Sequence, residues 1–190
     1  MAQCIKLVET AILAHDARHH GLSEVRVKTF DHLRVIGLRE WIGLPGLGIS
    51  KIKAKVDSGA KTSALHATDI ETFEREGETW VRFKAHTGTP QKPCNIDCEA
   101  RLISYKRIRS SNGQMQERHV IRTPLVMGDK CWWIDMTLTC RKSMRYRVLL
   151  GCTAMLDGQL VINPGLRFVQ DHPQTDLFDT DLLNKAEETP

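Results

Sequence analysis

The run Val56-Asp57-Ser58-Gly59-Ala60 places a carboxylate directly after a stretch in which lysines alternate with apolar residues. That alternation predicts a strand with one buried face, and the aspartate then stands at its end. Ser58 can hydrogen-bond across the turn, and Gly59 lets the backbone come close to the carboxylate. A carboxylate held in this way, with its tip exposed, suits acid–base chemistry. Asp, Ser and Gly are also common in ordinary β-turns. The tripeptide by itself therefore does not distinguish a reactive carboxylate from a plain turn.

A second apolar segment, Val148-Leu149-Leu150-Gly151, stands much later in the chain. Its residues do not alternate with polar ones, so we expect a strand that is covered on both faces. The residues that follow, Cys152-Thr153-Ala154-Met155-Leu156, predict a short helix. Taken alone, this segment indicates only a piece of the core.

The elements that must position these segments are mostly strands. A period of two predicts strands at 51–56, 81–85, 100–108, 120–126 and 132–139. Gly128-Asp129-Lys130 predicts a tight hairpin turn, and Ser110-Ser111-Asn112-Gly113 predicts another, because Asn-Gly is a strong hairpin signal. Many short strands separated by turns indicate an all-β barrel or sandwich-like domain.

Three parts of the chain differ in composition. Residues 1–32 predict an N-terminal extension, partly helical or disordered, because a polar stretch ending in Gly21 follows a short apolar one. Residues 33–169 carry the strand pattern and are expected to form the ordered domain. Residues 170–190 are acidic and predict a C-terminal tail.

The overall composition is that of a soluble globular protein, with 41% hydrophobic and 26% charged residues among 190. No stretch approaches the roughly 18 consecutive apolar residues of a membrane span. The apolar patch Ala11–Ala14 is too short and too closely flanked by charge for the core of a signal peptide. We therefore expect a cytoplasmic location and no membrane partner.

Metal, cofactor and nucleic-acid sites have little support in the sequence. Cys94 and Cys98 are a close pair, but no second Cys or His pair stands at zinc-finger spacing, and His-Glu-x-x-His is absent. His66 could reach the Asp57 site or a metal, although a partly exposed packing histidine fits its position better. The basic stretch 101–109 has Tyr105 as its single aromatic residue, which favours a solvated strand face over a nucleic-acid surface.

In this order, the segments around Asp57 and Gly151 resemble the retropepsin-like aspartic proteases, the single-lobe relatives of pepsin. That family has an apolar strand, Asp-[Thr/Ser]-Gly-Ala, a flap hairpin, a further hairpin, and then apolar residues with a glycine before a short helix. A closer resemblance is to a bacterial family labelled as ATP-dependent zinc proteases, sometimes found beside ATP-grasp glutamate ligases. The resemblance covers about 35–168, and its signature matches Arg39–Pro45, Lys53–Ala67 and Arg145–Gly151.

This resemblance implies an all-β, single-lobe retropepsin-like (acid protease) closed barrel with a flap hairpin and one short C-terminal helix. The residues that it implies for catalysis are Asp57, Ser58 and Gly59. Those that it implies for substrate binding are Ala60, Lys61, Thr62, Ser111, Asn112 and Gly113. The implied activity is that of an aspartic endopeptidase acting on a protein or peptide.

Such an enzyme needs two carboxylates that share one proton, because like charges about 3 Å apart cannot both ionise. The chain has one Asp-Ser-Gly; Asp157-Gly158 lacks the hydroxyl residue, and Asp179-Thr180-Asp181 lacks the glycine. We therefore expect a homodimer in which Asp57 meets its own copy across a two-fold axis.

The zinc and ATP of the family label do not fit the residues. Gly43–Gly48 is rich in glycine but leads into a strand rather than a helix N-terminus, so no phosphate cradle is implied. We expect neither a metal nor a cofactor. Both family patterns place an arginine directly after the glycine found at Gly151, and here that position is Cys152. Two alternatives therefore stay open: a catalytically silent peptide-binding module, and a metal-dependent protease as the label says.

Overall fold

The computed structural model describes residues 32–88, 91–109 and 115–178. The strands are β1 (Arg34–Ile36), β2 (Arg39–Leu44), β3 (Ile49–Val56), β4 (Ser63–Arg75), β5 (Glu78–His86), β6 (Asn95–Arg109), β7 (Met115–Met127), β8 (Lys130–Thr139), β9 (Val148–Leu150) and β10 (Leu160–Ile162). The helical elements are η1 (Pro45–Leu47), α2 (Cys152–Asp157) and η2 (Thr175–Leu177). Within the described ranges, no helix has the length and hydropathy that a membrane crossing requires.

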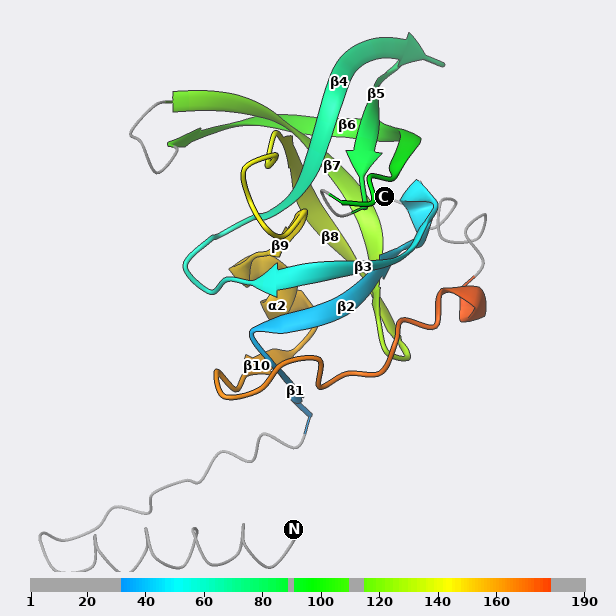
Figure 1. Cartoon of the computed structure of the whole chain (residues 1–190). Coiled ribbons are helices and arrows are strands. Elements are labelled where there is room, and N and C mark those ends of the chain that lie inside the picture. Colours follow the sequence, from blue (N-terminus) through cyan, green and yellow to red (C-terminus); the bar gives the residue numbers. More distant parts are fainter. Residues whose placement is uncertain (1–31, 89–90, 110–114, 179–190) are drawn as a thin grey trace, which may run out of the picture. The chain divides into compact units, whose positions relative to one another are not determined.

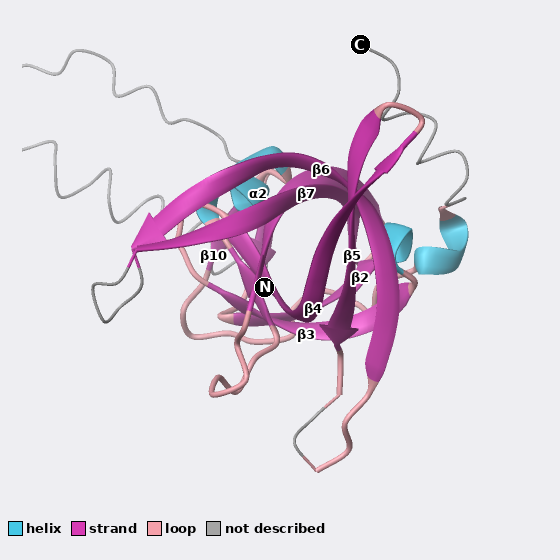
Figure 2. Ribbon diagram, turned by 90° about the horizontal axis from the view of Figure 1, so that it is seen from above, coloured by secondary structure: helices cyan, strands magenta, loops and turns pink. Residues whose placement is uncertain are grey.

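Eight strands form one mixed sheet that curls into a nearly closed ring. The order of neighbours is β2-β3-β9-β4-β5-β6-β7-β8, and two further pairings, β2–β7 and β4–β8, join strands that are distant in this order. β1 and β10 form a separate parallel pair. Figures 1 and 2 show the long strands β4, β6 and β7 bending around a common interior. The predicted all-β barrel with one short C-terminal helix is confirmed.

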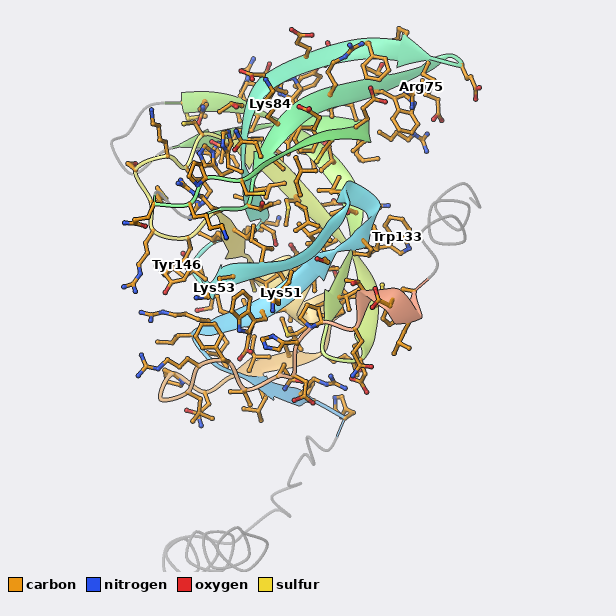
Figure 3. All side chains as sticks on the ribbon, turned by 45° about the vertical axis from the view of Figure 1, so that its right-hand side comes forward. Lys51, Lys53, Arg75, Lys84, Trp133 and Tyr146 are labelled. Carbon is orange, nitrogen blue, oxygen red and sulfur yellow. The ribbon has the colours of Figure 1, made fainter. Side chains whose placement is uncertain are left out.

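β3 has the two-faced character that its sequence predicts. Ile52, Ala54 and Val56 are at most 4% exposed and face the interior of the ring. The alternate positions are exposed lysines, of which Lys51 and Lys53 are labelled in Figure 3. The lysine side chains lie over the ring of Trp41 on β2, at 5.1 and 4.8 Å from its centroid, so the outer face of the β2–β3 hairpin is cationic and aromatic.

β4 is a strand that the sequence pattern did not predict. Residues 63–67 at its start are all buried, since this part of β4 lies beside β9 and β8 and then continues alongside β5. A segment covered on several sides loses the alternation that marks a half-buried strand. Farther along, Asp69 takes a left-handed conformation with φ of 52°, where the register with β5 shifts.

The hairpin turns agree with the sequence where they can be compared. Met127 pairs with Lys130 across the predicted turn, and Gly128 adopts a φ of 57° there, a conformation that glycine takes at little cost. β6 and β7 pair as far as Arg109 and Met115. The predicted turn between them, 110–113, lies outside the described residues.

Glu40 on β2 is completely buried and ties together distant parts of the chain. Its carboxylate accepts hydrogen bonds from the backbone N–H of Gly37 at 2.7 Å, Val169 at 3.0 Å and Gln170 at 3.2 Å. The rings of Phe168 and His172 pack against Trp41 beside it. The segment after β10 is therefore attached to β2.

The predicted division of the chain into an extension, a domain and a tail stays a prediction. The extension 1–32 lies outside the described residues apart from its last residue. Residues 170–178, the first part of the predicted tail, are described, and Gln174 donates its backbone N–H to the carbonyl of Gly128 at 2.9 Å. The rest of that tail, 179–190, is outside the described residues.

Replacing Glu40 with alanine should lower the free energy of unfolding by about 3 kcal/mol or more, because buried backbone donors lose their acceptor. Glu40→Gln should cost less, since its amide oxygen still accepts. Urea unfolding followed by tryptophan fluorescence measures both. Glu71→Ala, which removes an exposed carboxylate from β4, is the control and should change little. Equal stability of the Glu40→Ala variant and the control would contradict the role of Glu40 described above.

Candidate active site

Asp57 stands directly beyond the end of β3 and is half-buried. Its backbone N–H donates to the carbonyl oxygen of Leu150 at 2.9 Å, which extends the parallel pairing of Val56 with Leu150 by one hydrogen bond. Gly59 donates its N–H to Oδ1 of Asp57 at 3.1 Å. The main chain of this aspartate is therefore held by β9, and one carboxylate oxygen is oriented by its own turn.

The loop that follows, residues 57–62, is docked onto the start of α2. Cys152 donates its N–H to the carbonyl of Ala60 at 2.7 Å. Thr153 donates both its N–H and its hydroxyl to the carbonyl of Lys61, at 3.1 and 2.9 Å. Cys152 makes its bond through the backbone, while its half-buried side chain packs on the core. The cysteine in place of the family's arginine therefore leaves this docking intact.

Gly151 makes the close approach of α2 and this loop possible. A Cβ atom at this position would lie 2.6 Å from the carbonyl carbon of Thr62 and 2.8 Å from the backbone nitrogen of Ser63. The N–H of Gly151 donates to Oγ of Ser63 at 3.1 Å. Its φ of −90° suits any residue, so the glycine is needed here for space rather than for backbone conformation.

The hairpin of β6 and β7 reaches the same loop. Lys106 on β6 donates from Nζ to Oγ1 of Thr62 at 3.3 Å. The predicted residues of the loop, Asp57 to Thr62, are thus brought together with this hairpin at one place. Ser111, Asn112 and Gly113 lie outside the described residues, so their assignment to the flap tip stays a prediction, as do the roles of the other site residues.

A buried arginine interacts electrostatically with Asp57, and it was not predicted from the sequence. Arg141, in the loop before β9, is 7% exposed. Burial and the neighbouring Arg118 lower the pKa of its guanidinium, while the Asp57 carboxylate raises it. The sequence signal that could have found it is a cluster of four basic residues in 141–147, directly before the apolar strand β9.

His66 on β4 is 2% exposed, so the expectation of a partly exposed histidine was wrong. Its Nδ1 accepts the backbone N–H of Arg141 at 3.2 Å, and its ring stacks on His86 with 4.3 Å between centroids. Burial, with added repulsion from His86 and Arg147, lowers its pKa from 6.5 to about 4. The burial of His66 was not predicted because β4 was not recognised as a strand covered by β8 and β9.

Metal ligation has no support in the described part of the chain. Among these residues, no group of three or more His, Cys, Asp or Glu side chains could hold a metal ion. Cys94 and Cys98, the close pair in the sequence, differ in environment: Cys94 is exposed and Cys98 is buried. Burial raises the pKa of the Cys98 thiol to about 11, so it behaves as a small apolar side chain.

Comparison with known proteins gives three results. The model of a family described as "RimB-like: Retropepsin-like aspartic endopeptidase RimB" matches residues 35–173. Proteins called probable alpha-L-glutamate ligase are 46% identical over 134 residues in Desulfotalea psychrophila and 44% identical over 131 residues in Shewanella halifaxensis. These alignments cover 70% and 69% of this chain but 29% of each ligase, so the chain spans less than a third of their length.

A solved structure has the same fold. It is the crystal structure of a Legionella pneumophila protein with unknown function (DUF785), which aligns with a TM-score of 0.60 and 29% sequence identity. The alignment covers 71% of this chain and 96% of that one. The curled β-sheet described above is therefore shared by both proteins.

Gly151→Ala should destabilise the protein by about 1–3 kcal/mol, because the added methyl group meets backbone atoms that cannot yield without moving the Asp57 loop. Gly165→Ala is the matched control, since its nearest neighbour is a side-chain oxygen of Asn163 at 3.3 Å. Thermal unfolding of both variants measures the difference. A Gly151→Ala variant as stable as Gly165→Ala would show that the packing is not close.

The stability of the protein should fall as the pH decreases from about 6.5 toward 4. In this range an unfolded His66, with a pKa of about 6.5, binds a proton that the folded residue, with a pKa of about 4, does not bind. Urea unfolding at several pH values measures the slope, which should be shallower in His66→Gln. His172→Gln, which removes an exposed imidazole, should keep the slope of the wild type. An unchanged slope in His66→Gln would refute this assignment.

Proposed function

This chain belongs to the RimB-like family of retropepsin-like aspartic endopeptidases, and on that premise we propose that it hydrolyses peptide bonds with the Asp57 carboxylates of two copies. The observation that carries the proposal is the setting of Asp57. It is half-buried at a strand end, with its main chain bonded to Leu150 and its Oδ1 bonded to Gly59. A reactive carboxylate requires such a combination of fixed backbone and accessible tip.

The need for a second copy follows from the number of carboxylates. Among the described residues, the hydrogen bond to the Asp57 side chain comes from the backbone of Gly59 and not from a second carboxyl group. A two-fold dimer supplies the missing carboxylate without any further sequence motif. One Asp57 then takes a proton from water as the oxygen attacks the scissile carbonyl, and the other donates a proton to the carbonyl oxygen. Return of a proton to the amine releases both products.

The surroundings of Asp57 suit an extended peptide with acidic side chains. Arg141 interacts electrostatically with Asp57, and Lys106 contacts Thr62 from the β6–β7 hairpin. An extended segment can lie below such a hairpin and form main-chain hydrogen bonds like a further strand. The curated relatives are named as alpha-L-glutamate ligases, which supports a glutamate-containing peptide as the substrate of this chain.

A peptide-binding module without catalysis is the second candidate. The observation that favours it is Cys152, because the corresponding arginine supports the dimer in retropepsins, which this family resembles. Against it, the contacts of Cys152 with the Asp57 loop run through its backbone and do not require the arginine side chain. Both candidates share the fold and differ in whether bonds are cleaved.

Asp57→Asn should abolish cleavage of a peptide library rich in glutamate, by at least a thousandfold, because the amide can neither take up nor donate the proton. Mass spectrometry of the products from about pH 4 to 7 measures cleavage. Asp157→Asn, which changes an exposed aspartate outside the Asp57 loop, should cleave like the wild type. A chelator should have no effect. Activity that survives in Asp57→Asn and disappears with the chelator would establish the metal-dependent alternative.

Mixing tests the dimer separately. Excess Asp57→Asn protein added to the wild type should lower the activity, because subunit exchange produces mixed dimers with a single carboxylic acid. The same excess of Asp57→Asn protein should leave an unrelated protease unaffected. Activity per chain should also rise with protein concentration. Activity that changes neither with added Asp57→Asn protein nor with protein concentration would exclude a shared site. Peptide binding without cleavage under all conditions would favour the peptide-binding module.

A further inference from the structure

A cavity lies outside the Asp57 loop. It measures about 330 Å³ and opens between β4, β5 and the loop that leads into β9, which is yellow in Figure 1. None of residues 57–62 lines it. We call it the histidine cavity and define it by its polar lining residues, which are His66, Thr68, His86, Asn95, Lys142 and Arg147.

The charge of the histidine cavity has one sign. Lys142 and Arg147 line it, and none of the described residues that line it is Asp or Glu. This charge affects the pKa of His66. Burial lowers that pKa most, and His86, Arg147 and Arg141 lower it further by repelling a proton on the ring. A cavity with uncompensated positive charge attracts an anion and repels a metal cation.

Four of the polar groups of the cavity, those of His66, Thr68, His86 and Arg147, are already held in place by hydrogen bonds. Arg147 donates from Nη1 to the carbonyls of Arg141 and Lys142, at 3.2 and 3.3 Å, so its guanidinium is anchored to the loop. The carbonyl of Arg147 accepts the backbone N–H of His66 at 2.8 Å. On β4 and β5, Oγ1 of Thr68 and Nε2 of His86 are 2.8 Å apart. Little conformational entropy would be lost when a ligand binds to groups fixed in this way.

We propose that the histidine cavity binds an oxyanion, either a carboxylate or a phosphate group, between Arg147, Lys142 and the two histidines. Both ligand types offer several acceptor oxygens and negative charge, which guanidinium, ammonium and imidazole groups recognise by charge-assisted hydrogen bonds. The site does not use Asp57, so it goes beyond the proposed peptidase and can be tested without any cleavage assay.

The test uses the full chain and two probes, inorganic phosphate and acetate, added at constant ionic strength with chloride as the replacement ion. The ¹H–¹³C resonances of the His66 and His86 rings report on the cavity. We expect these resonances to shift until they saturate, and the pKa of His66 to rise from about 4, because a bound anion offsets the repulsion from Arg147, Arg141 and His86.

Two charge-removing substitutions distinguish a built site from general attraction. Lys142→Gln changes an exposed side chain of the lining and should weaken binding about tenfold. Arg145→Gln removes the same charge from the same loop, but Arg145 is exposed outside the lining, 5.8 Å from the ring centroid of Tyr146, which Figure 3 labels at the edge of the molecule. This control should bind like the wild type.

The outcomes separate clearly. Saturation by phosphate alone assigns a phosphate site, saturation by acetate alone assigns a carboxylate site, and saturation by both supports the shared oxyanion chemistry. Shifts that do not saturate with either probe would overturn the proposal. An equal loss in Lys142→Gln and Arg145→Gln would overturn it as well, because it would mean that the net charge of the loop and not the cavity attracts the anion.

Discussion

The parallel pairing of β3 with β9 is the constraint on which the candidate site depends. It aligns Val56 with Leu150, so the chain leaves both strands at the same edge of the sheet. The Asp57 loop and the start of α2 then emerge side by side and bond to each other through their backbones. Because a parallel pair needs a long crossover, almost the whole barrel lies between these two strands in the sequence.

Closure of the barrel explains why this edge is rigid. β4 pairs with β9 and with β8, so the strand that follows the Asp57 loop is held from two sides. Gly151 and Ser63 meet across this contact, and the hydroxyl of Ser63 accepts the glycine N–H. A mobile carboxylate would lose much of its use as an acid or base, since catalysis depends on a fixed geometry at the reacting atom.

The loop 141–147 connects the surroundings of Asp57 with the histidine cavity. The Asp57 carboxylate raises the pKa of the Arg141 side chain, whereas the backbone N–H of Arg141 donates to Nδ1 of His66. Burying a guanidinium is costly unless hydrogen bonds and an opposite charge offset the loss of water. Here the carbonyl of Tyr146 accepts from Nε of Arg141, and Asp57 supplies the charge.

The sequence by itself determined the features that depend on neighbouring residues. The alternation of Lys51 to Val56 predicted β3, the apolar run before Gly151 predicted a covered strand, and the family resemblance led to Asp57 and the curled β fold. Local patterns suffice there because each strand's faces are set by residues two apart.

Tertiary structure alone decided the contacts between residues that are far apart in the chain. The bonds of Glu40 to Val169 and Gln170, the stacking of His66 on His86, and the burial of Arg141 beside Asp57 all depend on which strands become neighbours. β4 was not predicted for the same reason. A strand that other strands cover on both faces lacks the alternation of polar and apolar residues by which a half-buried strand is recognised.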